Sequence, residues 1–112
     1  MPRTERKPLT EQDFVQNPTG KQFMNYALNS IGSMIRRVEL KWDPGYTGMS
    51  LDLFVKDVAM HGIELAREDL AKGLLRNEKE KSFQEFLWWR IKKAFNERLK
   101  ELGGDPGRAV FD

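Results

Sequence analysis

The fold is decided at residues 82–102, which read SFQEFLWWRIKKAFNERLKEL. Ser82 and Glu85 have the spacing of a capping box, in which the hydroxyl accepts from the Glu85 amide and the carboxylate reaches back to the Ser82 amide. Apolar residues then recur at steps of three and four, the period of one helical stripe, at Phe83, Leu87, Ile91, Ala94, Phe95 and Leu102. The pattern predicts a helix from residue 83 to the glycines at 103 and 104.

Two further helices are predicted upstream. The first covers residues 18–40, begins at Pro18, where a fixed φ favours a helix start, and has a stripe at Phe23, Met24, Ala27, Leu28, Ile31, Met34, Ile35 and Val38. The second begins after Ser50, whose hydroxyl can cap it, and stops near Gly73. Its stripe is Leu51, Phe54, Val55, Val58, Gly62, Leu65 and Ala66. We interpret residues 42–48 and 74–81 as loops.

The chain is therefore expected to be all-α, a small three-helix bundle with a loose basic N-terminal arm. Residues 1–17 are rich in charge and proline, with Phe14 and Val15 as the only anchor, and are interpreted as a flexible arm. Residues 18–104 form a single helical domain, and residues 105–112 a short tail. A chain of 112 residues supports about one hydrophobic core.

Composition argues against several classes of protein. No apolar run approaches the roughly 20 residues that span a bilayer, and the charged start has no signal core, so a cytoplasmic protein without membrane contact is expected. Cysteine is absent and His61 is the only histidine. With a single histidine we expect neither a metal site built from several histidines nor a Ser-His-Asp triad, and the glycines match no nucleotide-binding loop. We expect no enzyme, cofactor, metal or small-molecule substrate.

Charge is unevenly spread although the net charge is only +2. Residues 42–71 carry two basic and six acidic side chains, whereas residues 72–101 carry nine basic and five acidic ones. Such a distribution favours one surface for an anionic partner and another for a basic partner.

The third helix is expected to have a second, basic and aromatic face. On a helical projection Trp88 lies at the edge of the core stripe and Trp89 points nearly opposite to it. Because lysines neutralise phosphates and an indole stacks on unpaired bases, we predict nucleic-acid contacts by Phe86, Trp88, Trp89, Arg90, Lys92, Lys93, Asn96 and Lys100. The alternative is that Trp89 packs beneath the arm or a neighbouring helix, with lysine stems covering it. Arg98 projects into the core stripe, where it either snorkels or pairs with Glu64 or Asp69.

The second helix also has a face opposite its core stripe, formed by Leu53, Asp57, Met60 and Glu64 at helical spacing. This face is half apolar and half acidic. It is either a surface that binds a partner protein or the mark of a central helix covered on both sides, since periodicity does not separate the two.

Residues 82–95 resemble region two of bacterial sigma factors, and the similarity extends over about residues 50–100. In that family the same helix carries aromatic residues followed by a run like Arg90-Ile91-Lys92, and the upstream residues 50–58 resemble its Asp-Leu-Val-Gln-Asp/Glu pattern. The resemblance implies that the acidic second helix docks on RNA polymerase. It also implies that Trp88, Trp89, Arg90 and Lys93 face the promoter −10 element and hold its melted strand.

Two departures from that family shape the functional expectation. Lys56 replaces the family's glutamine, and too little chain follows the third helix for a helix-turn-helix domain. We therefore expect a partial sigma-like factor or regulator, such as half of a split factor or a phage or plasmid protein. The alternatives are a small helical assembly subunit, such as a phage adaptor or the small subunit of a CRISPR effector, and an inhibitor of a host enzyme. The partners expected are RNA polymerase or another large protein, together with nucleic acid.

Overall fold

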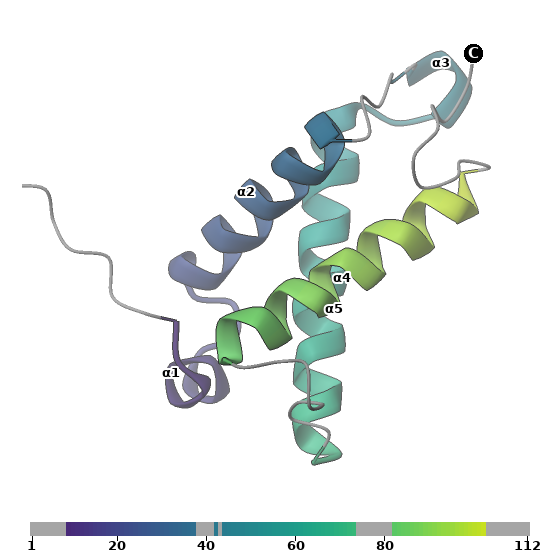
Figure 1. The fold of residues 1–112 in the computed structure, drawn as a ribbon. Helices are drawn as coiled ribbons and strands as arrows, with labels where there is room; N and C mark the ends of the chain where they lie inside the picture. The colour runs from purple at the N-terminus through teal and green to yellow at the C-terminus, as the bar shows by residue number, and fades with distance from the viewer. Residues whose placement is uncertain (1–8, 38–41, 43, 74–81, 103–112) are drawn as a thin grey trace, which may run out of the picture.

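The computed structural model describes residues 9–37, 42, 44–73 and 82–102. Every element in these ranges is a helix, which confirms the all-α prediction (Figure 1). In chain order the helices are α1 (Glu11–Gln16), α2 (Lys21–Arg37), α3 (Pro44–Thr47), α4 (Leu51–Ala71) and α5 (Phe83–Glu101). The first eight residues of the expected arm, the expected loop at 74–81 and the expected tail lie outside the described residues.

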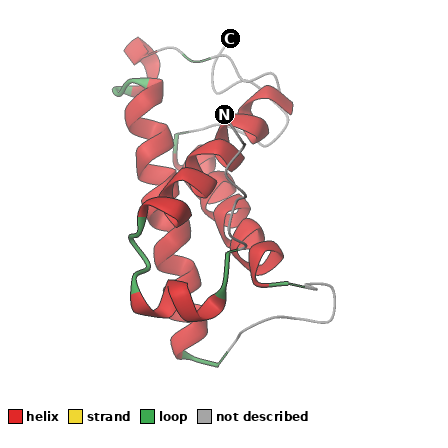
Figure 2. Cartoon of the chain, turned by 90° about the vertical axis from the view of Figure 1, so that its left-hand side faces the viewer, coloured by secondary structure: helices red, strands yellow, loops and turns green. Residues whose placement is uncertain are grey.

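Three long helices make the bundle. Helix α4 packs against both α2 and α5, and α2 also packs against α5. In Figure 1, α5 crosses α4 obliquely, and α1 lies beside the start of α5. Figure 2, turned by 90° about the vertical axis from Figure 1, shows that all the described elements are helices.

The α4–α5 crossing depends on a missing side chain. Gly62 is buried in α4, and a Cβ placed on it would lie 2.9 Å from the Cα of Ile91 in α5. Non-bonded carbon atoms prefer about 3.5–4.0 Å, so only glycine allows the two backbones to approach this closely. Ile91 is itself fully buried at the crossing.

The core extends further than the predicted stripes. Ala59 and Ile63 in α4, and Phe86 and Leu99 in α5, are buried although none was assigned to a core stripe. Each of these helices packs against two neighbours, so more than one stripe of it is covered.

The expectation of a loose arm is wrong for residues 9–17. Thr10 caps α1 by accepting a hydrogen bond from the Asp13 amide, and Phe14 is fully buried. The Phe14 ring lies 5.0 Å from Phe23 of α2 and 5.3 Å from Phe83 of α5, between ring centroids. Helix α1 therefore closes one end of the bundle.

Two other predicted boundaries also differ. Helix α2 begins at Lys21, because Gly20 donates to the Asn17 carbonyl in a turn that contains Pro18, while its own carbonyl accepts from Phe23. The expected loop at 42–48 contains the short helix α3, which is followed by Gly48 at φ 78°.

The predicted capping by the two serine hydroxyls is confirmed. Ser50 accepts from the Leu53 amide and Ser82 from the Glu85 amide, each through its hydroxyl. Helix α4 ends at Ala71, and Gly73 follows at φ 79°, the left-handed conformation that glycine adopts without strain. The sequence alone therefore predicted where α4 begins, where α5 begins and where α4 ends.

Two glycines inside the long helices, Gly62 and Gly32, test the crossing. We expect Gly62→Ala to lower the free energy of unfolding by about 1–3 kcal/mol, because the new methyl group overpacks the contact with Ile91. Gly32→Ala is the matched control, since its Cβ would meet only the Arg36 side chain at 3.6 Å. It should raise stability by about 0.5–1 kcal/mol through helix propensity. Urea unfolding followed by circular dichroism measures both, and equal effects of the two substitutions would contradict the close crossing.

Helix α1 is tested by truncating its two apolar side chains. We expect Phe14→Ala to cost about 3–5 kcal/mol, the usual effect of removing a buried phenylalanine. The neighbouring Val15 is 63% exposed, so Val15→Ala should change stability by less than about 0.5 kcal/mol. A Phe14→Ala protein with the stability of the native chain would show that α1 is a loose arm after all.

Candidate nucleic-acid interface

Trp89 lies on the outer face of α5. It is 45% exposed, which confirms the prediction that it points away from the core, and no side chain in the described ranges buries it. Around it lies a shallow hollow of about 330 Å³, lined by Trp89, Lys92, Lys93, Asn96, Glu97 and Lys100. We call Trp89, Lys92, Lys93, Asn96 and Lys100 the α5 strip.

The amine of Lys92 lies close to two indoles. Trp88 and Trp89 meet edge to face with 4.9 Å between ring centroids, and Lys92 Nζ lies 5.2 Å from one centroid and 5.4 Å from the other. Cation–π contacts of this kind contribute about 0.5–1 kcal/mol at exposed sites. The cluster holds the exposed ring and a positive charge next to each other.

Lys93 and Lys100 extend the positive charge along the same face. Both are exposed, and within the part of the chain that the structure describes no carboxylate forms an ion pair with either. Two turns of helix separate the ends of the lysine series, about 12 Å at 1.5 Å per residue. The face is therefore a short positive track beside an aromatic ring.

Three of the predicted contact residues do not belong to the α5 strip. Phe86 was expected beside Trp89, but it is fully buried, so its assignment to nucleic acid is wrong. Arg90 is only partly exposed: its guanidinium lies 4.2 Å from the centre of the Phe86 ring, and its Nε contacts Asp69 on α4. Arg90 therefore ties α5 to α4. Trp88 is partly buried against the core, as its position at the edge of the stripe predicted.

The predicted partner-binding face of α4 is open to solvent. Leu53 is 58% and Met60 63% exposed, and the carboxylates of Asp57 and Glu64 are also exposed. No described element covers these residues, which argues against a central helix buried on both sides. We call Leu53, Asp57, Met60 and Glu64 the α4 face.

Contacts between polar and charged side chains join the two helices along a seam beside these surfaces. His61 Nε2 of α4 lies 3.1 Å from Glu97 Oε1 of α5, close to the α5 strip. Positions 57, 61 and 69 of α4 pair with positions 98, 97 and 90 of α5, so the helices run antiparallel. The seam fixes the α5 strip relative to the α4 face.

Arg98 has different partners from those expected. Its Nε lies 3.1 Å from Asp57 Oδ2, an ion pair without hydrogen-bond geometry, and its Nη1 lies 3.2 Å from both carboxylate oxygens of Glu101. Glu64 and Asp69, the acids named from the sequence, pair with Arg67 and Arg90 instead. The antiparallel crossing explains the change, because it places position 98 level with the first turns of α4.

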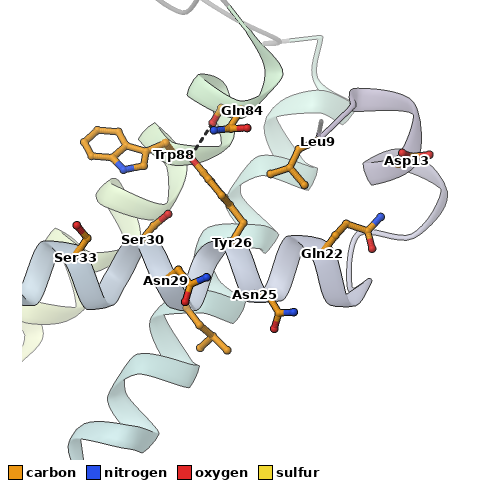
Figure 3. A pocket seen from close by; sticks show the side chains of 11 residues that line it. Leu9, Asp13, Gln22, Asn25, Tyr26, Asn29, Ser30, Ser33, Gln84 and Trp88 are labelled. Atoms are coloured by element: carbon orange, nitrogen blue, oxygen red, sulfur yellow. Dashed lines mark hydrogen bonds between the residues drawn. The ribbon is translucent and has the colours of Figure 1, made fainter. Parts of the chain in front are cut away.

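A second hollow, in which Asp13 is the one charged residue of the lining, was missed by sequence reasoning. It is an open groove of about 1200 Å³ lined from α2 by amides, hydroxyls and Tyr26, and from α5 by Gln84 and Trp88. Figure 3 shows Tyr26 reaching toward Gln84, whose carbonyl oxygen accepts a hydrogen bond from the phenol. Burial raises the pKa of the Tyr26 phenol above its ordinary value, against the opposing effect of hydrogen bonds with Ser30 and Gln84. One sequence signal was present: α2 carries no charged residue between Lys21 and Arg36.

Neither a metal-binding group nor a membrane-spanning helix is found among the described residues. No group of three histidine, cysteine, aspartate or glutamate side chains gathers to hold a metal ion among the described residues. Among the described helices, none combines the length and apolar character needed to cross a membrane.

Comparison with known proteins gave no relatives. The chain matched no model of a protein family, and searches of curated proteins and of solved structures likewise found no match.

Substitutions at positions 89 and 91 of α5 separate surface from core. We expect Trp89→Ala to leave the fold intact and to change unfolding by less than about 1 kcal/mol, since the ring is half exposed. Ile91→Ala should cost about 2–5 kcal/mol, because Ile91 is fully buried. Thermal unfolding measures both. If Trp89→Ala proves as damaging as Ile91→Ala, the indole belongs to the core.

Proposed function

We propose that this protein binds single-stranded nucleic acid through the α5 strip while the α4 face binds a large partner protein. In its most specific form, the protein is a partial sigma-like transcription factor or regulator in the cytoplasm. Helix α5 then contacts a melted promoter strand and α4 docks on RNA polymerase. No catalytic step is proposed.

The observation that carries the proposal is the exposed ring of Trp89 among lysines. The indole is 45% exposed, and Lys92, Lys93 and Lys100 lie on the same face. A base stacked on an aromatic side chain contributes about 1–3 kcal/mol whatever its identity. Lysines beside the ring neutralise the phosphates that flank such a base. An unpaired strand presents both groups together, whereas a duplex keeps its bases stacked.

The α4 face supports a protein partner. Leu53 and Met60 lie two helical turns apart, and each has more than half of its surface exposed. Asp57 and Glu64 alternate with them along the helix. Apolar anchors with acidic neighbours fit a partner surface that is apolar at its centre and basic at its edge.

The transcriptional form of the proposal depends on the resemblance to sigma factor region two. Trp88, Trp89 and Lys93 retain a surface position compatible with strand contacts, whereas Arg90 is committed to Asp69 and Phe86 to the core. Lys56 is an exposed residue of α4 that pairs with Asp52, so this departure from the family's glutamine changes the charge of the docking side.

A helical assembly subunit is the second candidate. The exposure of Val15, Leu53, Met60 and Trp89 supports it, because large apolar side chains at a surface are typical of contacts between chains. In that case Trp89 packs against a protein, and the chain has no affinity for oligonucleotides.

Binding to short oligothymidylate tests the proposal, with quenching of tryptophan fluorescence as the readout. We expect binding that weakens with salt, with a slope of log K against log salt near −2 for three lysine–phosphate contacts. Trp89→Ala should weaken binding by about 1–3 kcal/mol at unchanged slope. Lys93→Ala should weaken binding and reduce the slope by about 0.7.

Lys56→Ala is the matched control, since this exposed lysine lies on α4 outside the α5 strip. It should change neither affinity nor slope. Absence of oligothymidylate binding at low salt, or binding that Trp89→Ala leaves unchanged, would contradict the proposal.

A further inference from the structure

An exposed stripe of α4 is symmetric in both spacing and charge. Five exposed residues, at intervals of three, four, four and three positions, share one side of the helix, and they are Leu53, Lys56, Met60, Glu64 and Arg67. At 100° per residue they fall within an arc of about 80°, and at 1.5 Å per residue they extend over about 21 Å. We call these five residues the symmetric stripe.

The stripe is complementary to a reversed copy of itself. When two α4 helices lie antiparallel with Met60 facing Met60, position 56 of each lies level with position 64 of the other. Lys56 of one copy is then beside Glu64 of the second copy, and the same pair forms again across the two-fold axis. Leu53 lies level with Arg67, whose aliphatic stem can cover it.

We propose that two copies of this protein associate through the symmetric stripe in this antiparallel register. Interaction with the second copy covers Met60 and Leu53, which are 63% and 58% exposed in a single chain. In the dimer, Lys56 and Glu64 form ion pairs with the second copy in place of weak ion pairs within their own copy. The Lys56–Asp52 and Arg67–Glu64 pairs are exposed, with 3.4 and 3.1 Å between charged atoms, and exposed pairs contribute at most about 1 kcal/mol.

This inference deepens the proposed function, and one consequence of it, competition with the partner protein, rests on that function. The symmetric stripe shares Leu53, Met60 and Glu64 with the α4 face, so a second copy and the large partner protein compete for the same surface. A single pair of helices buries less than the about 1,200 Å² of a standard interface, which is typical of transient association. The dimer is therefore weak and gives way to a partner that binds more tightly.

Sedimentation equilibrium of the full chain, from micromolar to millimolar concentration, tests the pairing. We expect the average mass to rise from 13.1 kDa toward twice that value with increasing concentration. Lys56→Glu alone, or Glu64→Lys alone, should weaken association about tenfold, because each places like charges opposite each other twice. The double substitution Lys56→Glu with Glu64→Lys should restore association, since the pair is re-formed with its charges exchanged.

Three controls keep this test separate from the others. Circular dichroism should show that each variant is folded. Trp89→Ala should leave association unchanged, which distinguishes the α4 pairing from an assembly that buries Trp89. Oligothymidylate affinity should be the same for Lys56→Glu and the native chain, so a failure of strand binding is seen independently. A native chain that stays monomeric, or a double variant that associates no better than the single ones, would overturn the proposal.

Discussion

The close crossing of α4 and α5 at Gly62 and Ile91 is the constraint on which the other surfaces depend. A Cβ at position 62 would come within 2.9 Å of the opposing backbone, so the two helices share a contact that no larger residue permits. Ion pairs between positions 69 and 90, and between 57 and 98, lie on either side of this contact. Packing sets the distance between the helices, and the charges on either side favour one antiparallel register.

This crossing explains why one small domain has two unlike faces. Helix α5 directs Phe86 and Ile91 inward, which leaves Trp89 and its lysines outside. Helix α4 directs Phe54 and Val58 inward, which leaves Leu53 and Met60 exposed. The faces differ in chemistry because one pairs an aromatic ring with amines and the other pairs aliphatic groups with carboxylates. A module with these faces is suited to joining a nucleic-acid strand to a protein.

The long helices were predictable from the sequence because apolar period and capping residues agree there, as at Ser50 and Ser82. Helix α1 was not, since one phenylalanine among polar residues has no period; the capping threonine at position 10 was the available signal. Phe86 was misplaced for a different reason. A helical projection assumes one buried stripe, whereas α5 contacts two helices and buries a wider arc. Arg98 pairs with Asp57 rather than with Glu64 or Asp69. The register between two helices is set by their packing, which the period of a single helix does not predict.

The central claim is that the outer face of α5 receives an unpaired strand, and the indole N–H signals of the three tryptophans test it most directly. Trp42 is an internal control, because its Nε1 donates to the Met49 carbonyl and its ring packs on Phe54, away from the α5 strip. On titration with oligothymidylate, the account predicts that the Trp89 signal shifts most, that Trp88 follows, and that Trp42 stays in place. Equal shifts of all three signals, or no shift of Trp89 at saturating oligothymidylate, would contradict it.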